Sequence, residues 1–388
     1  ASASALRAAG PGVAAGAAAG AAAGAGFAAA GAGGPRAFNP DTGPVTGLDP
    51  ARRGARLTPV LKVCPMPRSP LVLIAAASLA GCAALVDGRA ERREASWEAA
   101  FPATGQFAEV EGRRLHLWVS GPARPGQQDV VLIHGANGNL RDFTYDLTGR
   151  LQGRFRVIAV DRPGLGWSET WGEADSDPAH QARVIRQALA GLGLRAPVVV
   201  GHSYGGAVAM AWALQDRGTG AVVLLAGATH PWPGETLGLW YRLNTTAIGE
   251  PARTLATALA PPATLDAALA GVFRPAPVPP GYGAHFGAPL ALRRESQAAN
   301  TRQVNALLHH VTRQQPAYAG LSLPIEIVHG DADTIVGLEI HARRLADEVE
   351  GANLTVIPGG GHMPHHSHPE LVVAVIERAA QRALSAGR

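Results

Sequence analysis

The stretch Pro197-Val198-Val199-Val200-Gly201-His202-Ser203-Tyr204-Gly205 decides the fold of this chain. Its valines predict a buried strand, and the helix-forming run Ala207–Leu214 follows directly. Alone, the pattern G-x-S-x-G is a weak signal in a chain with 48 glycines. Between a strand and a helix it is typical of a nucleophile elbow, a strained turn that exposes the hydroxyl of Ser203. The two glycines fit this turn because a residue without Cβ tolerates a close approach of the backbone.

A serine hydroxyl is a poor nucleophile at neutral pH and needs a histidine base that an acid orients. Where a serine sits on such an elbow, the acid and then the histidine follow it along the chain. The predicted strand Val222–Leu225 is followed by no carboxylate, whereas Ile325–Val328 runs into Asp331 and Asp333. These two carboxylates compete. One would bind the histidine, and the other would close the turn through its own backbone.

The candidate base is His362, on a glycine-rich loop after the predicted strand Leu354–Ile357. Three more histidines follow it closely: His365, His366 and His368. Such a group could form a metal cluster, but no H-x-x-x-H helix with supporting carboxylates is present, and Pro364 and Pro369 interrupt any helical register. We expect solvated loop residues there and no metal site.

The third requirement is a pair of backbone amides for the oxyanion. One is expected from Tyr204, directly after the serine, and the other from the loop His134-Gly135-Ala136-Asn137-Gly138. Ala136 is the first choice in this loop and Asn137 the alternative. His134 is expected to pack at a strand end, and His202 to fill the variable position of the elbow.

Strand-like and helix-like segments alternate from about residue 105, which predicts an α/β fold with a mainly parallel sheet. The candidate strands are short and mostly apolar, as expected where helices cover both faces of a sheet. They are Phe107–Val110, Leu115–Val119, Val130–Ile133, Arg156–Val160, Val198–Val200, Val222–Leu225, Ile325–Val328 and Leu354–Ile357. The first two form a leading hairpin. Eight strands are expected in all.

One long interval, residues 229–321, separates the sixth and seventh predicted strands. A structureless loop of that length is improbable, so we predict a helical cap inserted into a core of residues 106–228 and 322–388. Trp232, Trp240 and Tyr241 lie in the cap. They indicate either an apolar acyl or aryl pocket or the ordinary core of the cap.

The N-terminal part has a different composition. Residues 1–65 are mostly Ala, Gly and Pro and are expected to be a disordered extension. Residues 66–81 combine Arg68 with a short apolar run and predict a secretory signal. The polar residues 82–105 would then form a tether.

Charge and cysteine content support this division. Residues 1–81 hold seven basic and two acidic residues, which leaves 27 of the 34 basic and 28 of the 30 acidic residues for the remainder. The high isoelectric point therefore belongs to the N-terminal part, and no basic stripe indicates nucleic-acid binding. Besides Cys82 the chain has only Cys64, upstream of the signal, so the body must be stabilised by its core.

Two resemblances emerge from these residues. Leu79-Ala80-Gly81-Cys82 resembles the lipobox of bacterial lipoproteins, which implies acylation of Cys82 and a lipid-anchored position in the bacterial cell envelope, on the extracytoplasmic side. Residues 105–386 resemble the α/β-hydrolase family. The matching pieces are His134-Gly135, the run from Asp161 to Ser168, the elbow, Gly330-Asp331-Ala332-Asp333 and Gly361-His362.

The α/β-hydrolase resemblance implies that Asp333, fourth in its turn, is the acid, and that Asp161 shapes a loop. It implies a capped serine hydrolase without a metal or organic cofactor, most simply a carboxylic-ester hydrolase acting on a small molecule. Cleavage of carbon–carbon or amide bonds with the same residues, or a catalytically silent binding lipoprotein, are the alternatives. The family's dehalogenases and epoxide hydrolases carry aspartate at the nucleophile position, and Ser203 argues against both.

Overall fold

The computed structural model describes residues 70–121, 123, 124, 126–233 and 238–387. The predicted extension, residues 1–65, and the start of the predicted signal lie outside the described residues. From Val86 onward the described chain belongs to one compact unit, and residues 70–85 belong to another.

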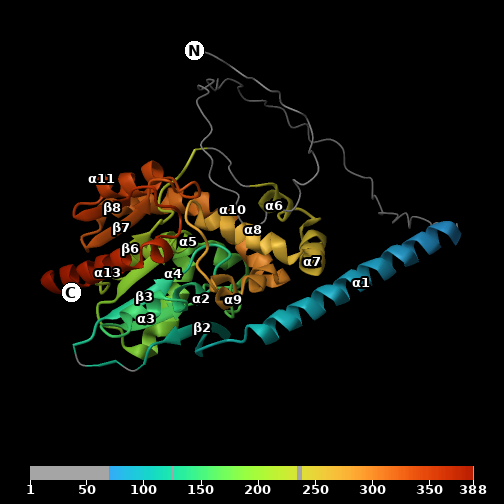
Figure 1. Ribbon diagram of the computed structural model, residues 1–388, viewed down its shortest axis with the longest axis horizontal. Coiled ribbons are helices and arrows are strands. Elements are labelled where there is room, and N and C mark those ends of the chain that lie inside the picture. Colours follow the sequence, from blue (N-terminus) through green and yellow to red (C-terminus); the bar gives the residue numbers. More distant parts are fainter. Residues whose placement is uncertain (1–69, 122, 125, 234–237, 388) are drawn as a thin grey trace, which may run out of the picture. The chain divides into compact units, whose positions relative to one another are not determined.

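An eight-stranded sheet forms the centre of the larger unit (Figure 1). Its strands are β1 (Gln106–Val110), β2 (Arg113–Val119), β3 (Asp129–Ile133), β4 (Arg156–Val160), β5 (Val198–His202), β6 (Ala221–Leu225), β7 (Ile325–Gly330) and β8 (Ala352–Ile357). They lie in the order β1-β2-β4-β3-β5-β6-β7-β8. β2 pairs antiparallel with β1 and β4, and all other neighbours are parallel. The predicted hairpin and the mainly parallel sheet are confirmed.

Helices cover both faces of this sheet. One face packs against α4 (Pro178–Leu189), α5 (Tyr204–Gln215) and α11 (Arg344–Glu348). The other packs against α3 (Leu147–Leu151) and α13 (Pro369–Ser385). Alternate residues of one strand face opposite sides, so Val131 and Ile133 join the first cluster, and Val130 and Leu132 the second. Burial on both faces explains why these strands are almost wholly apolar.

Short helices complete the core. They are α2 (Arg141–Thr144), α12 (Pro364–Ser367), the 3₁₀ helices Gly172–Ser176 and Ala190–Leu192, and the π-helical turn Glu339–Arg343. Helices α2 and α3 are separate because the backbone of Asp146, with φ −148°, leaves the helical region between them.

The described part of the interval between β6 and β7 is mainly helical. It contains α6 (Leu239–Leu243), α7 (Gly249–Leu259), α8 (Pro262–Phe273), α9 (Tyr282–Phe286), α10 (Arg294–Gln314) and the 3₁₀ helices Ala288–Leu292 and Gln315–Gly320. We call residues 238–320 the helical insertion.

The predicted tether, residues 82–105, is instead helical as far as Ala100, as part of α1 (Pro70–Ala100). Its polar, aperiodic sequence carries no apolar stripe to indicate packing. Ion pairs hold it to the insertion: the guanidinium of Arg294 binds Asp87 and, at 2.7 Å, Glu94. Among the described helices none is by itself long and apolar enough to cross a membrane, and only α7 and α8, bent by 104° from each other, meet that criterion as a pair.

Candidate active site

Ser203 lies at the junction of β5 and α5, where the sequence predicts the elbow. Its backbone is strained, with φ 52° and ψ −119°. A Cβ at Gly201 would collide with the carbonyl of Gly205, and one at Gly205 would collide with the carbonyl of Ile133. Both glycines are therefore required by the close crossing of β3, β5 and α5. This crossing holds the serine at the carboxyl edge of the sheet.

The turns after β7 and β8 bring together Asp333 and His362, the candidate acid and base. His362 Nδ1 and Asp333 Oδ2 are 2.8 Å apart, and both side chains are almost completely buried. The amides of Ile335 and Val336 donate to Asp333 Oδ1 at 2.8 and 3.0 Å. Burial alone would raise the pKa of Asp333, but the His362 imidazole and hydrogen bonds with His329 and His362 outweigh it and hold that pKa well below its usual range.

The competing carboxylate, Asp331, binds a backbone amide instead of the histidine. Asp331 Oδ1 accepts the amide of Gly359 at 2.6 Å, and its side chain is exposed. It therefore ties the turn after β7 to the loop that carries His362. Of the two carboxylates, Asp333 is therefore the one that contacts His362.

Ser203 and His362 line the same pocket. Within the described chain the Ser203 hydroxyl has no hydrogen-bond partner, so it is not yet engaged with the His362 imidazole. Catalytic hydrogen bonds are often long in structures without substrate and tighten when substrate binds. Ser203 and His362 thus share one pocket, and the Nδ1 of His362 contacts Asp333.

Ala136 and Tyr204, the candidates for the oxyanion, line the same pocket. Their backbone amides have no acceptor within the described residues. The amide of the alternative, Asn137, already donates to Asn300 Oδ1 at 2.7 Å. Tyr204 is also the first residue of α5, and a helix N-terminus favours negative charge.

A buried arginine supports the oxyanion loop. Arg162 Nε donates to the carbonyl of His134 and its Nη2 to that of Gly135, both at 2.9 Å. His134 Nε2 accepts the amide of Arg162 at 2.9 Å. Burial, followed by the charge of Arg162, lowers the pKa of His134 to about 4, so this imidazole is neutral. His134 is thus a loop support rather than only the packing residue we expected.

Asp161 also has a supporting position, as expected. Its carboxylate accepts the amides of Leu140 and Trp167 at 2.6 and 2.7 Å and lies 2.7 Å from His116 Nδ1. Neither Arg162 nor Asn300 was identified from the sequence as a support of the site. Only the position of Arg162 in the run from Asp161 to Ser168 could have indicated it.

The pocket is a cavity of about 170 Å³ between the sheet edge and the helical insertion. Of the three aromatic residues proposed from sequence, Tyr241 lines it, and Trp232 and Trp240 do not. Trp232 instead belongs to the core cluster that includes α5, with its ring 6.0 Å from that of His341. The Tyr241 hydroxyl accepts the side-chain amides of Asn137 and Asn300 at 3.2 and 3.3 Å.

The expectation of solvated histidines after His362 is wrong for two of the three. The side chains of His365 and His366 are 0% and 1% exposed, because both contact the buried carboxylate of Asp142. His368 is exposed, as expected. His202 is buried too, and its Nε2 lies 3.0 Å from the His362 carbonyl.

Comparison with known proteins places this geometry in a family. The model of the alpha/beta hydrolase family matches residues 130–375. An uncharacterised protein of Mycobacterium tuberculosis is 29% identical over 296 residues, which cover 71% of this chain and 81% of that one. Haloalkane dehalogenase 2 of the same organism is 26% identical over 294 residues, 72% of this chain and 96% of the relative.

Solved structures agree on the fold. An esterase from Exiguobacterium antarcticum has 19% sequence identity and a TM-score of 0.56, and the match covers 72% of this chain and all of the esterase. At that identity the likeness concerns the fold alone. The family model spans residues 130–375, which include the elbow, the turns that carry Asp333 and His362, and the insertion. The chain therefore belongs to the alpha/beta hydrolase family.

Proposed function

We propose that this chain is a serine hydrolase that cleaves carboxylic esters through an acyl-enzyme intermediate. One observation carries the proposal. A strained serine, an imidazole that is paired with a buried carboxylate, and two residues whose backbone amides are unpaired among the described residues line a single pocket.

The reaction would proceed by two proton transfers at each stage. Ser203 Oγ attacks the acyl carbon, and its proton passes to His362 Nε2, while Asp333 keeps the other ring proton on Nδ1. The amides of Ala136 and Tyr204 stabilise the tetrahedral oxyanion. The intermediate collapses, and the leaving alkoxide takes the proton from His362. Water then attacks the acyl-enzyme by the same route, releasing the carboxylic acid and restoring the serine.

The walls of the pocket support an apolar acyl or aryl substituent. Helix α8 contributes Leu265, Ala268, Leu269, Val272 and Phe273. Burying a methylene group there gains about 0.8 kcal/mol, close to a fourfold increase in kcat/KM for each carbon that fits.

A panel of p-nitrophenyl esters of increasing chain length tests both parts of this proposal. We expect kcat/KM to rise with chain length to a maximum and the Ser203→Ala variant to be inactive. Leu269→Trp should lower turnover of the longer esters and leave the acetate little changed. Leu255→Trp, on the exposed side of α7, is the matched control. An absence of turnover on every ester would favour carbon–carbon or amide cleavage instead.

The dehalogenase relatives do not change this choice. Hydrolytic dehalogenation by a carboxylate forms an ester that water can cleave. A serine would form an ether, which water would not cleave under the same conditions. Ser203 therefore favours acyl transfer.

We also propose that Cys82 carries a lipid anchor in a bacterial cell envelope. The lipobox-like sequence before it supports this, and its thiol is exposed. Expressed in a bacterium from Met66, the protein should partition into the detergent phase, and Cys82→Ser should abolish partitioning. Wild-type protein in the aqueous phase would contradict the anchor.

A further inference from the structure

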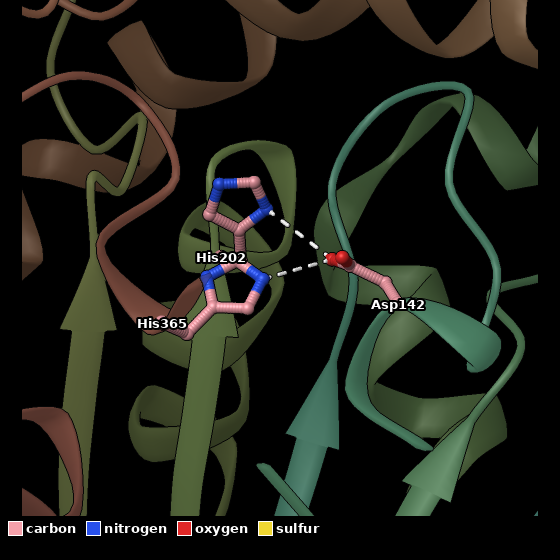
Figure 2. A group of neighbouring side chains, drawn as sticks. All are labelled: Asp142, His202 and His365. Carbon is pink, nitrogen blue, oxygen red and sulfur yellow. Dashed lines mark hydrogen bonds and ion pairs between the residues drawn. The ribbon is translucent and has the colours of Figure 1, made fainter. Parts of the chain in front are cut away.

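Behind the elbow, a buried carboxylate is surrounded by imidazoles. Asp142 comes from α2, His202 from the end of β5 and His365 from α12 (Figure 2). Their side chains are at most 5% exposed. Figure 2 shows both rings turned toward the carboxylate, with His365 Nε2 3.2 Å and His202 Nδ1 3.9 Å from Asp142 Oδ2.

Two ring nitrogens of this cluster, His202 Nδ1 and His365 Nδ1, lack a hydrogen-bond partner among the described residues, and His202 Nδ1 is the one that faces the carboxylate. His202 Nε2 faces the carbonyl of His362, so that nitrogen must carry the proton and donate it. His202 Nδ1 then presents a lone pair to the negative oxygen of Asp142. It is buried and has no hydrogen-bond partner within the described residues.

The far side of the carboxylate is already supported. Asp142 Oδ1 accepts the Tyr282 hydroxyl at 2.8 Å and faces His366 Nε2 at 2.8 Å. Residues that hold a metal ligand usually bind its second oxygen or its other ring nitrogen in this way. His202 is held in the same way, because its Nε2 contacts the His362 carbonyl and its other ring nitrogen, Nδ1, is left over. Oδ2 of Asp142 and Nδ1 of His202 are thereby left facing each other.

We propose that Asp142 Oδ2, His202 Nδ1 and His365 Nε2 bind a divalent transition-metal ion of the zinc class. These three atoms lie within 4.8 Å of one another. Tetrahedral ligands about 2.0–2.1 Å from zinc are about 3.3 Å apart. The His365–Asp142 distance already fits, and His202 has to approach by about 0.6 Å. Two imidazoles and one carboxylate favour zinc over calcium or magnesium, which prefer oxygen ligands.

The fourth coordination position and the entry path are provided by the pocket. Asp142 and His202 both line it. A bound ion would cross-link the elbow, the loop that carries His362 and the helix that follows the oxyanion loop. His365 must move its proton to Nδ1, which has no acceptor within the described chain, so the affinity should be modest, with Kd on the order of micromolar.

The test measures metal binding directly and does not depend on hydrolytic activity. Untagged protein is titrated with Zn²⁺ by calorimetry and with Co²⁺ by visible absorption. We expect one equivalent bound, a tetrahedral cobalt spectrum and a rise in Tm with Zn²⁺. Asp142→Asn and His365→Gln should each weaken binding at least tenfold. His368→Gln, which removes an exposed histidine of the same segment, should bind as wild type does.

Two results would overturn the site. Folded wild-type protein that binds neither ion at 1 mM would do so. Binding of equal strength in wild type and both ligand variants would place the ion elsewhere, for example at His362 or at the surface. Circular dichroism shows whether each variant is folded. If one of the two ligand variants is unfolded, the binding measured for the other variant decides. Anomalous scattering at the zinc edge of wild-type crystals locates the ion whether or not both variants fold.

Discussion

Replacing Asp333 by asparagine should change the tautomer of His362 while leaving the other contacts of the site in place. The amides of Ile335 and Val336 donate to Asp333 Oδ1, and an asparagine oxygen can keep both bonds. Its NH₂ group must then occupy the position of Oδ2, 2.8 Å from His362 Nδ1. An amide donor there forces the ring proton onto Nε2, the nitrogen that has to accept the proton of Ser203.

The expected loss follows from this tautomer. In a serine triad the same change lowers kcat by about 10⁴, which corresponds to about 5.5 kcal/mol at 1.36 kcal/mol for each factor of ten. KM should change by less than about threefold, since Asp333 does not line the pocket. Initial rates on a p-nitrophenyl ester over a range of concentrations give both constants.

The neighbouring Asp331→Asn is the matched control. It makes the same chemical change two residues away, in a side chain that binds the Gly359 amide and does not contact His362. Its kcat/KM should remain within about threefold of wild type. If Asp333→Asn kept more than a tenth of the activity while Asp331→Asn lost it, the acid would be Asp331.

Three further predictions concern stability and the oxyanion loop. Burial lowers the pKa of His134 to about 4 and that of His341 to about 3, so each stays neutral in the folded chain while its unfolded form takes up a proton near pH 6.5. The free energy of unfolding is therefore unaffected by these two groups above pH 6.5 and falls as the pH decreases, by about 2 kcal/mol for each histidine at pH 5. Equal urea midpoints at pH 7.5 and pH 5.0 would contradict this prediction. Asn300→Ala frees the amide of Asn137 and should lower kcat about tenfold through a looser oxyanion loop; an unchanged kcat would show that the loop needs no such support. Arg294→Met removes the ion pairs with α1 and should lower the free energy of unfolding by about 1 kcal/mol, measured by urea titration, and no loss would mean that these partly exposed pairs contribute nothing.

The sheet and the catalytic turns could be predicted because their signals are local. Val198–Val200 is apolar on both faces, so its place in a covered sheet is evident, and it lies within the observed strand Val198–His202. The glycines on either side of Ser203 are needed because a Cβ at either position would collide with a backbone carbonyl, so their presence in the sequence indicates the tight turn. His362 and Asp333 follow strand ends, where parallel strands bring side chains together at one edge.

The rest depends on contacts between distant segments. His365 and Asp142 are 223 positions apart, so nothing near His365 indicates that it is buried against a carboxylate. Asn300 supports Asn137 from the helical insertion, 163 positions away. Asp87 and Glu94 of α1 are bound by ion pairs to Arg294 rather than by an apolar stripe. The sequence around a charged residue does not indicate which distant residue it pairs with. Neither the amino-acid composition nor the hydrophobic periodicity predicts such long-range contacts.

The most direct measurement is covalent capture of the nucleophile. A fluorophosphonate should add one phosphonyl group, located at Ser203 by peptide mass spectrometry, and the Ser203→Ala variant should stay unmodified. In crystals of the adduct, the phosphonyl oxygen should lie about 2.7–3.1 Å from the amides of Ala136 and Tyr204. Folded wild-type protein that remains unlabelled, or a label on any other residue, would contradict the proposal that Ser203 is the nucleophile.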